Sequence, residues 1–184
     1  MCYTLFMEKM IMIYVVYDSF FGNTEKVAKH IAETLDAKAI KLPATLPLNQ
    51  GDVLILGCPT RAFSHTPLAK QFIKAHKQQF SNMAFATFDT RMDVSQVNNK
   101  LLTFLAKHFG YAAEKMEKQL TKQGAKQLVA HTYFFVKDTE GPLLDDQLKN
   151  AQTWAKTIKQ TLNPSKHPTI KYPKKTVAKK AKTM

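Results

Sequence analysis

Apolar residues of this chain gather in short runs that alternate with segments of helical periodicity. Most of the runs contain β-branched or aromatic side chains and are shorter than a typical helix, which predicts β-strands. The predicted strands span residues 11–17, 38–42, 52–57, 83–88 and 127–136.

Between these runs, apolar residues recur at spacings of three and four, the period of an amphipathic helix. In the first such segment one face carries Val27, Ala28, Ile31, Ala32 and Leu35. The last predicted helix covers about residues 143–161, and its apolar stripe contains Leu144, Leu148, Ala151, Trp154, Ala155 and Ile158. Both segments are therefore expected to lie against the strands.

Two further helices are predicted by their end signals. Thr66 followed by Pro67 is typical of a helix start, because a hydroxyl caps free N–H groups and proline fits the first turn. Leu68, Phe72 and Ile73 form the apolar stripe that follows. The segment 96–122 is long and helical, is interrupted at Gly110, and is followed by Gly124 at a C-terminal cap position.

Strands that alternate with helices predict an α/β fold, with a parallel sheet covered by helices on both faces. Five strands fit the doubly wound sheet of order 2-1-3-4-5. Right-handed crossovers then bring the carboxyl ends of the first, third and fourth strands together at the point where the strand order reverses. A binding site is expected at that edge.

The loop after the first strand, "DSFFGNT", carries the most informative chemistry. A helix that begins there offers free backbone N–H groups and the positive end of its dipole, which suits a phosphate. Ser19 and Thr24 add hydroxyl groups, and Gly22 lets the backbone approach a ligand closely. The loop contains no lysine or arginine, so these donors are neutral. It matches neither the GxGxxG nor the GxxxxGK[ST] pattern.

Four segments together resemble the flavodoxin family: "YDSFFGNTEKVAKHIAE", "LILGCPTRAFSHTPLAKQFI", "FDTR" and "GPLLDDQLKNAQTWAK". The resemblance covers roughly residues 11–162 and implies a flavodoxin-like fold that binds FMN. It implies that residues 19–24 hold the FMN phosphate and that the loops 58–63 and 89–92 border the isoalloxazine ring. Phe21 departs from the family pattern, which commonly has threonine there.

On this resemblance the candidate cofactor-binding residues are Ser19, Phe20, Phe21, Gly22, Asn23, Thr24, Pro59, Thr60, Arg61, Ala62, Phe63, Asp89, Thr90 and Arg91. One of the two phenylalanines of the first loop is expected to pack beneath the turn, and the other to line the ribityl channel. Cys58 is expected to be a small buried residue and not a redox partner.

The distribution of cations adds a second clue. The chain has 25 lysines and only two arginines, Arg61 and Arg91, and each arginine falls in a loop expected to border the flavin. A guanidinium offers a fixed fork of donors and stacks on flat rings. One or both arginines are expected to approach the flavin or an anionic co-substrate, with chance placement and structural ion pairs as the alternative.

Charge and composition also divide the chain. Residues 163–184 carry seven lysines, three prolines and no acid, and are interpreted as a basic tail that contacts polyanions weakly, with no specific nucleic acid predicted. Residues 1–10 are interpreted as an N-terminal extension without signal-peptide features. No apolar run is long enough for a membrane span. With two distant cysteines and scattered histidines, a cytoplasmic protein without a metal site is expected.

Two functions remain open within the flavoprotein interpretation. The protein is either an electron carrier that serves a redox partner protein, or an enzyme that passes hydride from NAD(P)H through FMN to a quinone or similar acceptor. The compact domain favours the carrier, whereas its basic character favours the enzyme. A pure interaction module on the same scaffold is a third possibility, since a fold does not fix a function.

Overall fold

The computed structural model describes residues 11–94, 104 and 108–163. The predicted extension 1–10, residues 164–184 of the predicted tail and most of the segment 95–107 lie outside these ranges. The described strands are β1 (Ile13–Tyr17), β2 (Lys38–Lys41), β3 (Val53–Pro59), β4 (Ala84–Met92), β5 (Lys126–Gln127) and β6 (Thr132–Val136). The helices are α1 (Asn23–Thr34), α2 (Pro67–Ala75), α4 (Ala112–Lys122) and α5 (Gln147–Leu162).

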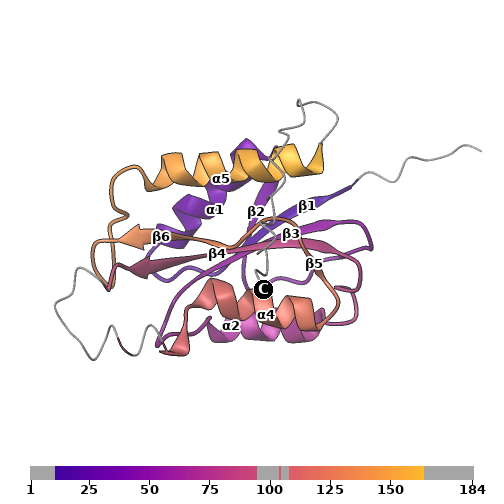
Figure 1. The fold of residues 1–184 in the computed structure, drawn as a ribbon, viewed down its shortest axis with the longest axis horizontal. Coiled ribbons are helices and arrows are strands. Elements are labelled where there is room, and N and C mark those ends of the chain that lie inside the picture. Colours follow the sequence, from indigo (N-terminus) through magenta and orange to yellow (C-terminus); the bar gives the residue numbers. More distant parts are fainter. Residues whose placement is uncertain (1–10, 95–103, 105–107, 164–184) are drawn as a thin grey trace, which may run out of the picture.

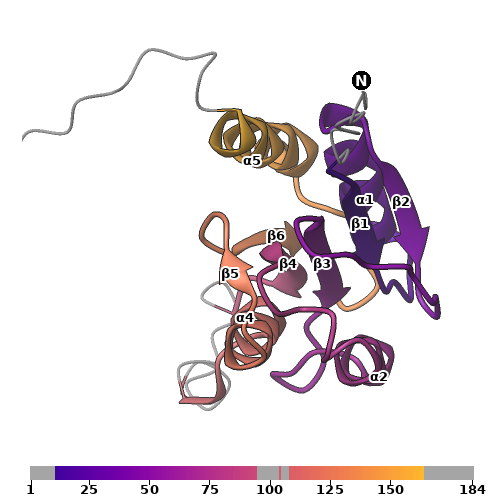
Figure 2. The same ribbon diagram turned by 90° about the vertical axis from the view of Figure 1, so that its right-hand side faces the viewer.

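The predicted α/β architecture is confirmed. The strands pair in parallel in the order β2-β1-β3-β4-β5, and β6 also pairs with β4. Helices α1 and α5 cover one face of the sheet, and α2 and α4 cover the other (Figure 1 and Figure 2). Within the described ranges, no helix combines the length and apolar character needed to cross a lipid bilayer.

Two cores fill the space between the sheet and its helices, because successive residues of a strand face opposite sides. On β3, Leu54 and Leu56 pack toward the layer of α2 and α4. Val53 and Ile55 pack toward α1 and α5. The continuous apolar run of this strand is thus explained by burial on both faces.

The last predicted strand is interrupted. Residues 126–127 pair with the start of β4 and residues 132–136 with its end, so four intervening residues bulge away from the ladder. The Trp154 indole N–H donates to the Ala130 carbonyl oxygen in this bulge at 3.2 Å. The sequence pattern does not reveal this interruption, because Leu128 and Val129 in the bulge are apolar and still pack against the core.

The end signals in the sequence predicted the helix ends better than the apolar stripes predicted the buried faces of the helices. The Thr66 hydroxyl accepts the Ala69 N–H at 3.3 Å, as predicted for the start of α2. Gly124 lies just beyond the C-cap of α4 with a φ of 88°. On α5 the predicted stripe is too long, since Leu144 precedes the helix and both Leu144 and Leu148 are exposed.

Gly57 lies directly opposite Phe88 in the ladder between β3 and β4. A Cβ atom at residue 57 would come within 2.1 Å of the Phe88 ring, which is fully buried. We expect Gly57→Ala to lower the free energy of unfolding by about 1–3 kcal/mol, the usual cost of an overpacked core. Urea unfolding measures this loss.

The matched test places Gly57→Ala in a Phe88→Leu background, where the smaller side chain makes room for the new methyl group. The two changes should then cost less together than the sum of their separate effects. Additive losses would show that the close approach to Phe88 is not what excludes a side chain at residue 57.

Candidate functional site

The carboxyl ends of β1, β3 and β4 meet at one edge of the sheet, and a pocket of about 190 Å³ lies there. It is lined by Ser19, Phe20, Phe21, Asn23, Thr24, Pro59, Thr60, Arg61, Ala62, Thr90, Arg91, Met92, Val136 and Thr139. Three of the residues predicted from sequence do not line it: Gly22, Phe63 and Asp89. Gly22 shapes the first loop, Phe63 lies in the turn after β3, and Asp89 lies buried behind Arg91.

The turn from β1 into α1 leaves several backbone donors free. Gly22 adopts a φ of 82° as the N-cap residue, a conformation that glycine takes without strain. The N–H groups of Gly22, Asn23 and Thr24 have no acceptor among the described residues. The Ser19 hydroxyl oxygen accepts the Glu25 N–H at 3.3 Å, so its own O–H is free to donate.

Hydrogen bonds from two other segments hold this turn in place. The hydroxyl groups of Thr24 and Thr90 lie 2.7 Å apart and join the turn to the end of β4. The Asn23 side-chain amide donates to the Glu140 carbonyl oxygen at 2.8 Å. A Cβ atom at Gly141 would come within 2.4 Å of that amide, so the loop after β6 approaches the turn closely. The free N–H groups are therefore fixed before any ligand binds.

The two phenylalanines of the turn are both exposed, with 58% of Phe20 and 48% of Phe21 accessible to solvent. The prediction that one of them packs beneath the turn is therefore wrong. The Arg61 guanidinium carbon lies 5.3 Å from the Phe20 ring centre and 5.1 Å from that of Phe21. This cation–π contact gives both rings a partner that the hydrophobic pattern of the sequence does not show.

Arg61 is held at the pocket by a tight turn. Arg61 and Ser64 exchange two backbone hydrogen bonds of 2.9 Å, and the residues between them, Ala62 and Phe63, have φ values of 44° and 56°. Two consecutive left-handed residues suit glycine or asparagine, and other residues adopt this conformation at a cost. Strain of this kind concentrates at functional sites.

Arg91 makes a different kind of contact. Its Nε and Nη2 atoms each donate to an Asp89 carboxylate oxygen at 2.6 Å. Its guanidinium carbon lies 3.6 Å from the Tyr111 ring centre and 4.3 Å from that of Tyr133. Arg91 thus reaches the pocket wall as one half of a buried ion pair sandwiched between two tyrosines.

The positive charge of Arg91 is neutralised by the Asp89 carboxylate, whereas no described carboxylate neutralises that of Arg61. Burial raises the pKa of the Asp89 carboxyl, while the Arg91 guanidinium and the Ala113 N–H, which donates at 2.9 Å, counter that rise. No carboxylate of the described residues forms an ion pair with Arg61. Of the two arginines that line the pocket, Arg61 is therefore the one whose charge is available to a ligand.

Cys58 is fully buried at the end of β3. Burial raises the pKa of its thiol, and the carboxylates of Asp89 and Asp18 raise it further. Its Sγ lies 3.7 Å from the Met116 Sδ atom. A protonated, enclosed thiol is unreactive, so Cys58 serves as packing.

Sequence reasoning missed Val136 and Thr139, and it left Met92 out of the candidate residues although Met92 falls in the range 89–92 expected to border the ring. Met92 and Val136 are the last residues of β4 and β6 and are partners in the ladder. Thr139 lies in the loop that follows, and its hydroxyl donates to the Met92 Sδ atom at 3.7 Å. These residues could have been found from the parallel order of the strands, because the carboxyl end of β6 must lie at the same edge of the sheet as that of β4.

The sequence matches a family described as the flavodoxin domain, over residues 14–164. The chain belongs to the flavodoxin family. Among solved structures, flavodoxin 1 from Bacillus cereus matches with a TM-score of 0.62 and 18% identity, over 81% of this chain and 97% of that one. No curated protein matches this sequence significantly.

Two other solved structures extend the range of relatives with this fold. A flavodoxin, WrbA-like protein from Agrobacterium tumefaciens matches with a TM-score of 0.60 and 17% identity, over 83% of this chain and 98% of that one. A flavodiiron core from Synechocystis matches with a TM-score of 0.55 and 15% identity, over 84% of this chain and 36% of that one. At these identities the likeness is one of fold.

Proposed function

We propose that this flavodoxin-family protein binds FMN in the pocket at the ends of β1, β3 and β4 and carries electrons for a redox partner protein. The observation that carries the proposal is the set of free donors where β1 turns into α1. Three backbone N–H groups that have no acceptor among the described residues and the free O–H of Ser19 lie at the positive end of a helix dipole. The Thr24 hydroxyl, which bonds that of Thr90, lies beside them. This donor set fits a phosphate ester.

The remaining walls fit the other parts of FMN. The ends of β3 and β4 supply Pro59, Thr60, Thr90 and Met92, a mixed polar and apolar wall for a flat ring. When bound, FMN supplies the reversible uptake of electrons. The protein orients the cofactor through the fixed turn of residues 19–24 and covers part of it with the exposed phenylalanine rings.

Arg61 sets the charge at the edge of this site. An unpaired cation near the cofactor stabilises added negative charge and raises the reduction potential. We expect Arg61→Ala to lower the midpoint potential of bound FMN by about 20–40 mV, since a charge several ångströms away contributes about 1–2 kcal/mol. Arg91, already paired with Asp89, should contribute less.

Redox titration of the FMN-loaded protein measures this shift. Arg61→Lys is the matched control, because it keeps the charge while removing the planar guanidinium, and its potential should stay close to that of the parent. A potential in Arg61→Ala equal to that of the parent would contradict the role given to this cation.

The second candidate is an NAD(P)H-dependent oxidoreductase acting on a quinone or similar acceptor. The observation that favours it is the exposed pair Phe20 and Phe21 in contact with Arg61, whose charge no described carboxylate pairs, since such a surface suits a flat or anionic co-substrate. Stopped-flow oxidation of NADPH by the FMN-loaded protein separates the two functions. Rates near the background of free FMN support the carrier, whereas rapid turnover with a quinone supports the enzyme.

A further inference from the structure

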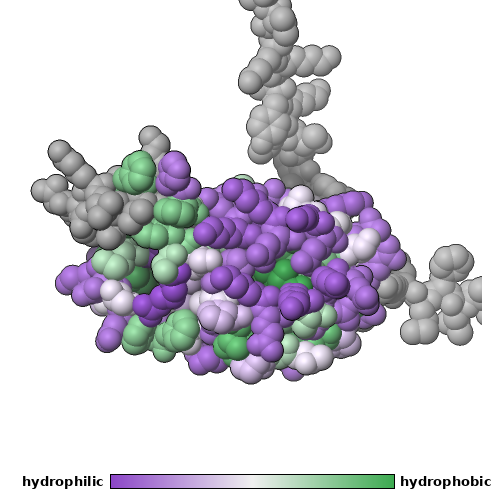
Figure 3. Space-filling view, turned by 90° about the horizontal axis from the view of Figure 1, so that it is seen from below, coloured by the Kyte–Doolittle hydropathy of each residue, from purple (hydrophilic) through white to green (hydrophobic). Residues whose placement is uncertain are grey.

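A second hollow, of about 500 Å³, lies between α2 and α4 on the face of the sheet seen in Figure 3. We call it the lysine groove; it is lined by Lys70, Ile73, Lys74, Lys77, Gln119, Lys122 and Gln123. None of these residues lines the proposed FMN pocket. None carries a carboxylate, so every charge around the groove is positive.

The lysines of the groove have no ion-pair partner among the described residues. Only three of the described lysines, Lys29, Lys41 and Lys159, form ion pairs, so lysines outside the groove also lack a described partner. What distinguishes the groove is that four lysines and no acid line one hollow. Lys70 and Lys74 lie four residues apart on α2, and like charges at that spacing destabilise a helix slightly.

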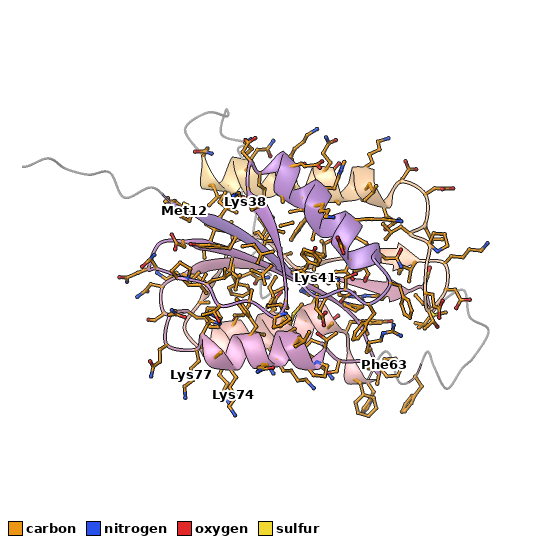
Figure 4. The ribbon with its side chains drawn as sticks, turned by 180° about the vertical axis from the view of Figure 1, so that it is seen from behind. Met12, Lys38, Lys41, Phe63, Lys74 and Lys77 are labelled. Atoms are coloured by element: carbon orange, nitrogen blue, oxygen red, sulfur yellow. The ribbon has the colours of Figure 1, made fainter. Side chains whose placement is uncertain are left out.

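The other residues of the groove give it an apolar wall and a fixed amide but no aromatic ring. Ile73 forms an apolar, buried part of its wall. The side chain of Gln119 is fixed, because its Oε1 atom lies 3.1 Å from His65 Nε2. No aromatic residue lines the groove, so it lacks the stacking surface that single-stranded nucleic acids use. Figure 4 shows Lys74, on α2, and Lys77, just beyond the end of α2, projecting away from the sheet.

We propose that the lysine groove binds an acidic segment of a partner protein, with the carboxylates of that segment spaced as on one face of a helix. Lys70 and Lys74 lie about one turn apart on α2, about 6 Å along its axis, because each residue of a helix rises about 1.5 Å. Glutamates at the same spacing on a partner helix meet these two lysines, and Lys77 and Lys122 add positive charge beside them. The lysine stems and Ile73 provide apolar contact along that helix.

Charge also argues against a second copy of this chain as the occupant. The chain carries 27 lysines and arginines against 14 acids, a net charge of +13, so two copies repel each other at long range. The groove shares no residue with the FMN pocket, so a segment bound there anchors a partner and leaves the pocket open. The proposal does not depend on the identity of the cofactor.

The test uses the full chain and a fluorescent helical peptide that carries glutamate at positions i, i+4 and i+7 of each repeat. Fluorescence anisotropy at about 0.1 M salt gives its affinity for the parent protein. The groove variant is Lys70→Glu/Lys74→Glu/Lys77→Glu. The control variant is Lys38→Glu/Lys137→Glu/Lys156→Glu, which changes the net charge equally at exposed lysines outside the groove. Circular dichroism verifies folding, and a Lys→Gln series replaces any variant that fails to fold.

We expect the groove variant to bind the peptide about tenfold more weakly than the control variant, a difference of about 1.4 kcal/mol. Three outcomes would overturn the proposal. Equal loss in both variants would mean that overall charge alone drives binding. A DNA oligonucleotide that binds more tightly than the peptide, with the same dependence on the groove, would make it a nucleic-acid site. Self-association lost only in the groove variant would make it a dimer contact.

Discussion

Replacement of Asp89 by alanine is expected to lower the free energy of unfolding by about 3–5 kcal/mol, because it leaves a buried cation without its partner. The Asp89 carboxylate is fully buried, accepts two bonds of 2.6 Å from Arg91, and also accepts the Ala113 N–H. Without it, the Arg91 guanidinium stays enclosed between two tyrosine rings with its charge unpaired. Urea unfolding of Asp89→Ala against the parent measures this loss.

The control removes both charges together. In Asp89→Leu/Arg91→Met the apolar side chains occupy similar volumes and leave no uncompensated ion, so this double variant should be more stable than Asp89→Ala. If Asp89→Ala unfolds within about 0.5 kcal/mol of the parent, as surface substitutions do, the pair does not hold the end of β4 in place.

The second large effect concerns the cofactor. We expect Ser19→Ala/Thr24→Val to weaken FMN binding on the order of a hundredfold or more, because each hydroxyl that bonds a charged group contributes about 1.5–3 kcal/mol. Both hydroxyls lie on the turn between β1 and α1, and Thr24 also bonds Thr90 there. Quenching of flavin fluorescence on titration with protein gives the dissociation constant.

Riboflavin provides the matched ligand, since it has the same ring and ribityl chain but no phosphate. Its affinity should be nearly the same for the parent and the double variant. Thr157→Val, on the far helix α5, is the matched protein control and should bind FMN as the parent does. An equal loss of riboflavin and FMN affinity would mean that the two hydroxyls do not contact the phosphate.

Periodicity was sufficient to predict the layers. Strands such as β3 are apolar on both faces, which predicts a sheet covered on both sides, and the strand order came from the doubly wound arrangement that five such strands fit. The interruption between β5 and β6 could not be predicted from the apolar run, and the hydrogen bond made there, from the Trp154 indole of α5 to the Ala130 carbonyl, joins separate segments. That contact is distant in sequence.

Part of the candidate site could also be predicted from the sequence, and part could not. Its location followed from the topology, and the Asp89–Arg91 pair could have been inferred, because residues two apart on a strand face the same side. The tyrosines around Arg91 could not, since Tyr111 and Tyr133 come from separate segments. The exposure of Phe20 and Phe21 was likewise hidden, because hydrophobic patterning places aromatic rings in the core and gives no sign of a cation such as Arg61 above them.

Absorbance titration of the flavin-free protein with FMN tests directly whether the turn of residues 19–24 forms part of an FMN site. We expect a change in the visible flavin spectrum that saturates at one FMN per chain and is lost in Ser19→Ala/Thr24→Val. A spectrum equal to that of free FMN at every ratio of protein to cofactor would contradict it.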